Sequence, residues 1–154
     1  FNAGIKPAVN PGISVSRVGG SAQIKATKQV AGSLRLDLSQ YWEMEAFAQF
    51  GSDLDKTTLA QLERGKRLIE ILKQDQYNPL NIAEQIAIIY AAVEGFLDKV
   101  PTDKVKNFEK ELLSILNMQY AQILEDIRSK KVLDNDIKAG LDKAIKECQG
   151  LFVE

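Results

Sequence analysis

Hydrophobic side chains recur at intervals of three and four residues along most of the chain after Gln23. Between Gln23 and Phe50 these positions are Ile24, Thr27, Ala31, Leu34, Leu38, Tyr41 and Ala48. The spacing predicts one long amphipathic helix with a single buried face. Gly32 lies within this segment, and we expect a kink or a break there because glycine weakens a helix.

A second helix is expected after a short connection. Gly51 is predicted to end the first helix and Ser52 or Asp53 to cap the next one, since these residue types are favoured at helix ends. Glu63 and Arg67, four residues apart, are predicted to pair on the polar side of this second helix. Its hydrophobic positions are Leu59, Leu62, Ile69 and Leu72.

A polar loop over residues 74–79 separates this helix from a strongly hydrophobic one. Asn81 and Glu84 form a capping-box pattern at the start of that helix, which is predicted to run from Ile82 to Glu94. Gly95 follows at the position where a glycine commonly ends a helix.

Three further helices complete the pattern. The first follows Pro101 and carries Val105, Phe108, Leu112, Ile115 and Leu116. The others are expected over residues 121–127 and, led by Asp134, over residues 135–152. The chain therefore predicts a mainly α fold, a multi-helix bundle of about six or seven helices with short connections.

The first twenty residues differ in composition from the rest. They contain Gly4, Gly12, Gly19 and Gly20 together with Pro7 and Pro11, and a short β-branched run at residues 13–16. We expect loops and a short strand here, too few residues to form a core of their own. The chain begins at Phe1, so we expect residues 1–20 to be the remnant of a preceding domain and residues 21–154 to form the helical domain.

Composition excludes several classes of chemistry. The 154 residues are 45% hydrophobic with a formal net charge of −1, which is typical of a globular chain. No apolar run approaches the roughly 20 residues that a membrane span needs. The chain has no histidine, and Cys148 is its one cysteine, so histidine-based catalysis, CxxC redox chemistry and cysteine-rich zinc sites are excluded.

Charge is distributed unevenly along the chain. Residues 1–36 contain five basic side chains and no acidic one, while the remainder is acidic overall. A basic, acid-free stretch ahead of an acidic body indicates that the front end faces an anion, although five charges are few enough to arise by chance.

Two places could carry chemistry. In the first, Ser14, Ser16 and Arg17 precede Gly19 and Gly20 at an expected helix start, an arrangement suited to binding a phosphate, with an ordinary surface arginine as the alternative. The GxxxxGK[ST] phosphate-binding pattern is absent. In the second, the loop over 73–79 offers amides and a tyrosine that could meet a nucleotide base, but polar loops between helices often have this composition.

At these residues the sequence resembles the alpha subunits of F-type ATP synthases. The resemblance is dense over residues 1 to about 100. It is carried by the run FNAGIKPAVNPGISVSRVGG at the start, by KQVAGSL from Lys28, by AFAQFGSDLD from Ala46, and by Leu72-Lys73-Gln74. Beyond Pro101 the residues differ from those typical of the family, while the helical pattern still agrees with it.

The resemblance implies roles for six residues. Arg17 would be an arginine finger, inserted into a catalytic site held mainly by a neighbouring beta subunit, and Ser14 matches a position needed for activity. Positions that close over the adenine of the alpha subunit's own non-catalytic nucleotide match Lys6, Pro7, Gln74 and Gln76. Lys6 stands where many members have arginine, and Trp42 also replaces a usual arginine.

The same resemblance implies the setting. ATP or ADP with Mg²⁺ would be bound in the parent complex, whose phosphate loop and magnesium ligands lie upstream, so the chain alone is expected to bind nucleotide poorly and to be inactive. We expect no metal site in this chain. Its partners would be beta subunits, the gamma subunit and other subunits, with no nucleic acid, in a rotary proton-translocating complex at the cytoplasmic face of a bacterial inner membrane.

Two other functions are weighed against this one. A stand-alone helical module for protein–protein interaction, without nucleotide chemistry, fits the helical pattern but leaves the basic front end and its motif unexplained. An autonomous enzyme is disfavoured because histidine, a phosphate loop and a paired-carboxylate site are all missing from the sequence.

Overall fold

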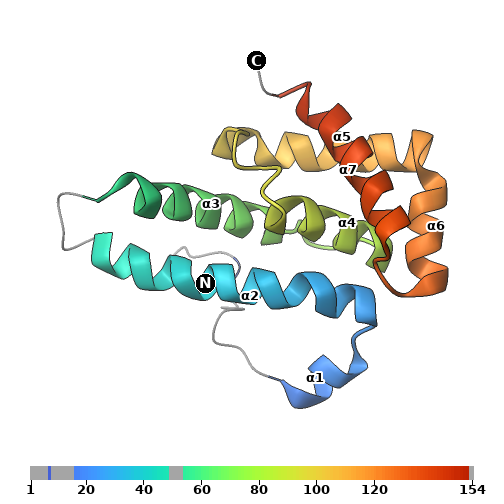
Figure 1. Cartoon of the computed structure of the whole chain (residues 1–154), viewed down its shortest axis with the longest axis horizontal. Coiled ribbons are helices and arrows are strands. Elements are labelled where there is room, and N and C mark those ends of the chain that lie inside the picture. Colours follow the sequence, from blue (N-terminus) through green and yellow to red (C-terminus); the bar gives the residue numbers. More distant parts are fainter. Residues whose placement is uncertain (1–6, 8–15, 49–53, 153–154) are drawn as a thin grey trace.

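The computed structural model describes residue 7, residues 16–48 and residues 54–152. Within these ranges the chain forms seven α-helices and one short 3₁₀ helix, without a strand, so the predicted mainly α class is confirmed (Figure 1). The elements are α1 (Arg17–Ala22), α2 (Lys25–Ala48), α3 (Lys56–Leu72), α4 (Ile82–Val93), η1 (Thr102–Lys104), α5 (Val105–Gln119), α6 (Ala121–Lys130) and α7 (Asn135–Gln149).

The bundle is arranged around α4. Helix α2 runs alongside both α3 and α4, which follow one another along roughly the same line, and α5, α6 and α7 also pack against α4 (Figure 1). Eight of the twelve residues of α4 are buried, while Ile82 and Gln85 in its first turn are exposed. A helix with so many hydrophobic residues is expected to lie largely inside a fold, and α4 does.

Helix α2 continues through Gly32 without interruption, so the predicted break at that residue is wrong. Gly32 is exposed, and a Cβ added there would enter open space, whereas Val30, Leu34 and Leu38 are buried on the opposite face. Burying three such side chains contributes several kcal/mol, which outweighs the roughly 1 kcal/mol that one glycine costs a helix.

The start of α3 differs from the prediction. Its cap is Asp55, whose carboxylate oxygen Oδ1 accepts hydrogen bonds from the amides of Thr57 at 2.8 Å and Thr58 at 2.9 Å. Ser52 and Asp53 are therefore not the cap; with Gly51, they lie outside the described residues. Asp55 is an effective cap because its side chain accepts hydrogen bonds from two otherwise unpaired amides of the first turn.

The buried face of α3 is also rotated from the predicted one. Leu62 is buried as expected, but Leu59 is 47% exposed, and the other buried positions are Gly65, Leu68 and Ile71. Ile69 and Leu72 are partly buried against the core. The predicted Glu63–Arg67 pair is present, with 3.9 Å between Nη1 and Oε2.

Three predicted helix ends are confirmed. Asn81 and Glu84 form a reciprocal capping box at the start of α4. Gly95 follows the end of α4 with a φ of 84°, a conformation that favours glycine. Asp134 caps α7 by accepting from the amide of Ile137 at 2.9 Å.

Helix α7 ends close to the one cysteine of the chain. Cys148 is fully buried, and its Sγ lies 3.7 Å from the carbonyl oxygen of Phe108 on α5. Burial, with smaller contributions from Glu111 and Glu147, raises the pKa of this thiol to about 12.

Helix α3 approaches α2 closely at Gly65. A Cβ added to this residue would lie 2.2 Å from Cδ2 of the Tyr41 ring, which is far inside van der Waals contact. The absence of a side chain at Gly65 therefore allows the two helices to pack at this point.

Among the helices of the described segments, none is both long and apolar enough to cross a bilayer.

We predict that Gly65→Ala lowers the free energy of unfolding by about 1–3 kcal/mol, because the added methyl group must displace Tyr41 or separate α2 from α3. The matched change Gly32→Ala places a methyl group in open space on α2 and should raise the same quantity by about 0.5–1 kcal/mol. Urea unfolding followed by circular dichroism measures both. An equal effect of the two changes would contradict the packing argument.

Candidate functional site

Arg17 is the first residue of α1, which contradicts the expectation that it precedes the first helix. The sequence Arg17-Val18-Gly19-Gly20-Ser21-Ala22 was expected to begin as a loop because of its two glycines. Hydrogen bonds made by two side-chain hydroxyls stabilise the helical conformation that the glycines disfavour. Ser16 Oγ accepts from the Gly19 amide at 2.9 Å, and Ser21 Oγ donates to the Arg17 carbonyl at 2.9 Å.

Helix α1 presents Arg17 to the outside. It has no buried residue, Arg17 is exposed, and Val18 beside it is 82% exposed. In the described part of the chain, no hydrogen bond or ion pair involves the Arg17 guanidinium. A cation in the first turn of a helix is also disfavoured by the helix dipole, so this position does not stabilise α1. Among the described residues none occupies the guanidinium, whose planar fork of donors suits an anion.

The other predicted residues near the start are described only in part. Ser14 and Lys6 lie outside the described residues. Pro7 forms a bend and is half-buried.

The α3–α4 connection carries the second predicted group, Gln74 and Gln76. Both are exposed, but their surroundings differ. Gln74 Nε2 donates to the Asn78 carbonyl at 2.9 Å, and the Asn78 amide donates back to the Asp75 carbonyl at 3.3 Å. The side chain of Gln74 therefore braces the loop, and Gln76 lies on the turn that it braces.

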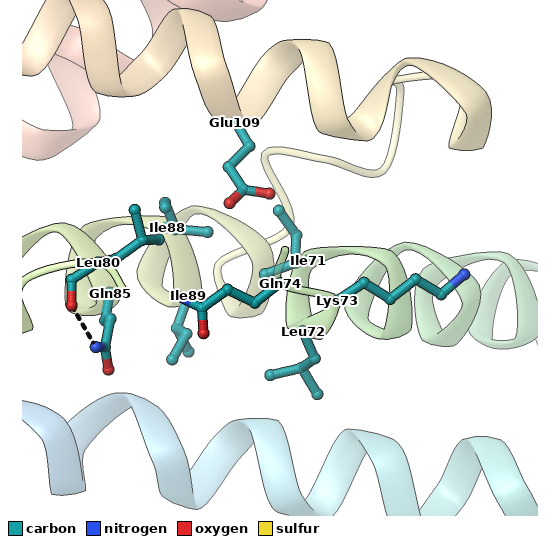
Figure 2. Close-up of a pocket in the computed structure, with 9 residues that line it drawn as sticks. All are labelled: Ile71, Leu72, Lys73, Gln74, Leu80, Gln85, Ile88, Ile89 and Glu109. Atoms are coloured by element: carbon teal, nitrogen blue, oxygen red, sulfur yellow. Dashed lines mark hydrogen bonds between the residues drawn. The ribbon is translucent and has the colours of Figure 1, made fainter. Parts of the chain in front are cut away.

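Both ends of this loop are fixed to neighbouring helices. At one end Lys106 Nζ on α5 donates to the Lys73 carbonyl and lies 2.7 Å from Oε2 of Glu109. At the other end Gln85 Nε2 on α4 donates to the Leu80 carbonyl at 2.7 Å, drawn as the dashed line in Figure 2. A loop held in this way is preorganised, so binding a ligand would require little further ordering.

A cavity of about 120 Å³ lies beneath the loop. Figure 2 shows Glu109 pointing toward it from α5, above Gln74 and Ile71. Its walls are mainly aliphatic, with amides at the edge; the lining residues are Ile71, Leu72, Lys73, Gln74, Leu80, Gln85, Ile88, Ile89 and Glu109. A second cavity of about 260 Å³ shares Gln74, Leu80 and Glu109 and extends to Lys106 and Lys110. Aliphatic walls with a few amides suit a flat heterocycle.

Tyr77 is the tyrosine of this loop that the sequence offers for contact with a nucleotide base. It is 92% exposed and has a φ of 63°, in the left-handed region that residues other than glycine and asparagine rarely adopt. The left-handed conformation at Tyr77 could not be foreseen, because tyrosine rarely adopts it and no neighbouring residue type marks it.

The structure does not join the two candidate regions to each other. Across the described residues, no hydrogen bond or ion pair links α1 to the α3–α4 loop. Arg17 and the two glutamines are therefore separate elements of this chain. The described residues also contain no group of three or more acidic or cysteine side chains arranged to hold a metal ion.

Comparison with known proteins identifies the family. The model of the ATP synthase alpha/beta chain, C-terminal domain, matches residues 23–148. The chain belongs to this family. It is 54% identical over 153 residues, or 99% of its length, to ATP synthase subunit alpha of Wolinella succinogenes. It is 58% identical over all 154 residues to ATP synthase subunit alpha of Helicobacter pylori.

These matches confirm the resemblance to ATP synthase alpha subunits. They extend it beyond Pro101, where few family motifs could be recognised in the sequence. The chain spans 31% of the length of each of the two relatives. The family match covers α2 to α6 and most of α7, while α1 and Arg17 lie ahead of it.

We predict that the two glutamines of the loop differ in what they do for stability. Gln74→Ala removes the hydrogen bond to the Asn78 carbonyl and should lower the free energy of unfolding by about 0.5–1.5 kcal/mol. Gln76→Ala should leave it unchanged within about 0.5 kcal/mol, as for an ordinary surface change. Urea unfolding of the two variants measures this difference, and equal losses would argue against the bracing role of Gln74.

Proposed function

We propose that the chain is a segment of the alpha subunit of a rotary ATP synthase and contributes to the head of that complex. The observation that carries this proposal is the similarity to two ATP synthase alpha subunits along the whole chain. The helical domain would be structural and regulatory. The chemistry would depend on nucleotide sites that it completes together with other parts of the complex.

Arg17 is proposed to act as an arginine finger in a catalytic site of a neighbouring beta subunit. Its exposure on a short helix, without a described partner, supports this role. A guanidinium placed beside the transferring phosphoryl group stabilises the charge that develops on its oxygens in the transition state. Ser14, three residues earlier, is proposed to support activity at the same site.

The α3–α4 loop is proposed to contact the adenine of a non-catalytic nucleotide, together with Lys6 and Pro7. The smaller cavity beside Gln74 fits part of a nucleotide base, since it has mainly aliphatic walls and two side-chain amides. The larger cavity is more polar, with Lys106, Lys110 and Glu109 among its lining residues. The sequence offers no phosphate-binding loop, so phosphates and Mg²⁺ would be held by other parts of the subunit. The bound nucleotide would supply a regulatory ligand, and this chain would recognise its base.

The partners proposed for the chain are beta subunits, the gamma subunit and the remaining subunits of the complex. The complex would be peripheral to a bacterial inner membrane on its cytoplasmic face and coupled to proton transport. By itself the chain would be inactive, because its arginine acts on a nucleotide that another subunit binds.

We predict that Arg17→Lys in the assembled complex lowers the turnover of ATP hydrolysis by at least about two orders of magnitude. Lysine keeps the charge and the helix but replaces a planar fork by a mobile point charge, so the geometry at the phosphoryl group is lost. Assembly and nucleotide affinity at the catalytic sites should change little, because the interaction is made in the transition state. Steady-state hydrolysis and nucleotide binding, measured on the same preparations, give both quantities.

The control for this variant is Arg128→Lys, which alters an exposed arginine of α6 beside Glu125. It should leave turnover unchanged. Near-normal turnover in Arg17→Lys would remove the catalytic role of Arg17.

We also predict that Gln76→Ala weakens nucleotide binding at the non-catalytic sites about three- to tenfold, the effect of losing one or two hydrogen bonds to a base. The double change Gln74→Ala with Gln76→Ala should weaken binding further. Loading of the catalytic sites should be unaffected in both variants. Nucleotide occupancy of the complex measures this, with Gln122→Ala on α6 as the control, and unchanged occupancy in the double variant would exclude contact between the loop and adenine.

A further inference from the structure

The amino end of α2 is held by the connection between α6 and α7, more than one hundred residues later in the chain. Gln29 donates from Nε2 to the Leu133 carbonyl at 3.1 Å and accepts from the Leu133 amide through Oε1 at 2.9 Å. Three residues earlier on α2, the Ala26 amide donates to the Lys131 carbonyl at 2.9 Å. Figure 1 shows the α6–α7 connection lying beside this end of α2. We call these three hydrogen bonds the Gln29 clasp.

The clasp satisfies groups that helix ends normally leave free. The first amides of a helix have no partner within it, and here a carbonyl from another part of the chain accepts from one of them. Lys131 ends α6 with a φ of 56°, a left-handed conformation that is uncommon for lysine. Leu133 is 4% exposed and fixes the connection in the core, so the clasp joins α2 to a buried part of the bundle.

The clasp lies next to the connection that joins α1 to α2. Helix α1 has no buried residue and reaches the bundle through Gln23 and Ile24, which precede α2 directly. Ile24 packs against the core, and Ala26 is fully buried. The direction in which α1 leaves the bundle is therefore set where the clasp holds α2. Loosening the clasp would let the first turn of α2 fray and α1 move with it.

We propose that Gln29 is a positioning residue for Arg17: through the clasp, the α6–α7 connection fixes the end of α2 from which the arginine-bearing helix extends. This inference rests on the proposed role of Arg17 in catalysis. A side chain that acts in a transition state must be placed within a fraction of an ångström, and a misplacement of 1 Å can lower a rate by about a hundredfold. Gln29 influences turnover in this way without contacting nucleotide.

The test is Gln29→Ala in the assembled complex. Both hydrogen bonds to Leu133 are lost, and we expect kcat of ATP hydrolysis to fall about five- to tenfold while KM stays within about twofold. Hydrogen exchange of the backbone amides over residues 16–30 should become faster in the same variant, because the first turn of α2 opens more often. A uniform loss of stability would not produce this local change.

The matched control is Gln149→Ala, which removes a hydrogen bond of 2.8 Å from α7 to the Phe96 carbonyl. It also deletes a part-buried, long-range glutamine contact, but at a site that does not hold α2. Turnover and exchange over residues 16–30 should be unchanged in this variant. An equal fall of kcat in both variants would overturn the proposal, since it would reflect stability alone.

A second variant keeps the test decisive if Gln29→Ala does not assemble. Gln29→Glu retains an oxygen for the Leu133 amide but loses the donor to the Leu133 carbonyl, and it should lower kcat with faster exchange over the same residues. If a Gln29 variant has a normal kcat while the separate variant Arg17→Lys is impaired, the positioning role of Gln29 is overturned and the proposed catalytic role of Arg17 is kept. Normal turnover in Arg17→Lys overturns the proposed function itself.

Discussion

The burial of α4 is the constraint on which the rest of the fold depends. This helix has hydrophobic residues on all sides, and alanines at several positions let its neighbours approach closely. Most of its surface is covered because α2, α3, α5, α6 and α7 all pack against it. Two arginines on α3 complete the arrangement: Arg64 and Arg67 donate to the carbonyls of Val93 and Val100, on either side of the turn that follows α4. The positive charge of Arg64 also lies at the end of α4 where the helix dipole favours a cation.

Most of the helical architecture could be predicted because hydrophobic periodicity is a local signal. The ends of α4 and α7 were predictable for the same reason, since Asn81, Glu84, Gly95 and Asp134 act within a few residues of where they stand. The helix break expected at Gly32 does not occur, because the opposite face of α2 is buried. The buried face of α3 could not be derived from spacing alone, because the close contact of Gly65 with Tyr41 determines its rotation.

The candidate site was predictable in its residues and less so in its geometry. Arg17 and the two glutamines could be chosen from the sequence, with the roles supplied by the resemblance. The helix at Arg17 is stabilised by hydrogen bonds of Ser16 and Ser21. It was not predicted because the two glycines between them indicate a loop. The separate tasks of Gln74 and Gln76 depend on one hydrogen bond across the loop. The spacing of hydrophobic residues does not reveal hydrogen bonds between a side chain and a backbone group elsewhere in the chain. The Gln29 clasp consists largely of such bonds, so it could not be predicted either.

The burial of Cys148 has a consequence for chemical work on this chain. A thiol becomes reactive as its thiolate, and a pKa raised to about 12 keeps this one protonated at neutral pH. With its sulfur enclosed between α5 and α7, the residue is shielded from alkylating reagents, from oxidants and from a second molecule of the chain. Because the sequence has no other cysteine, a cysteine introduced on the surface would carry the single reactive sulfur. Fluorophores, spin labels and crosslinkers can thus be attached at chosen introduced cysteines without labelling Cys148.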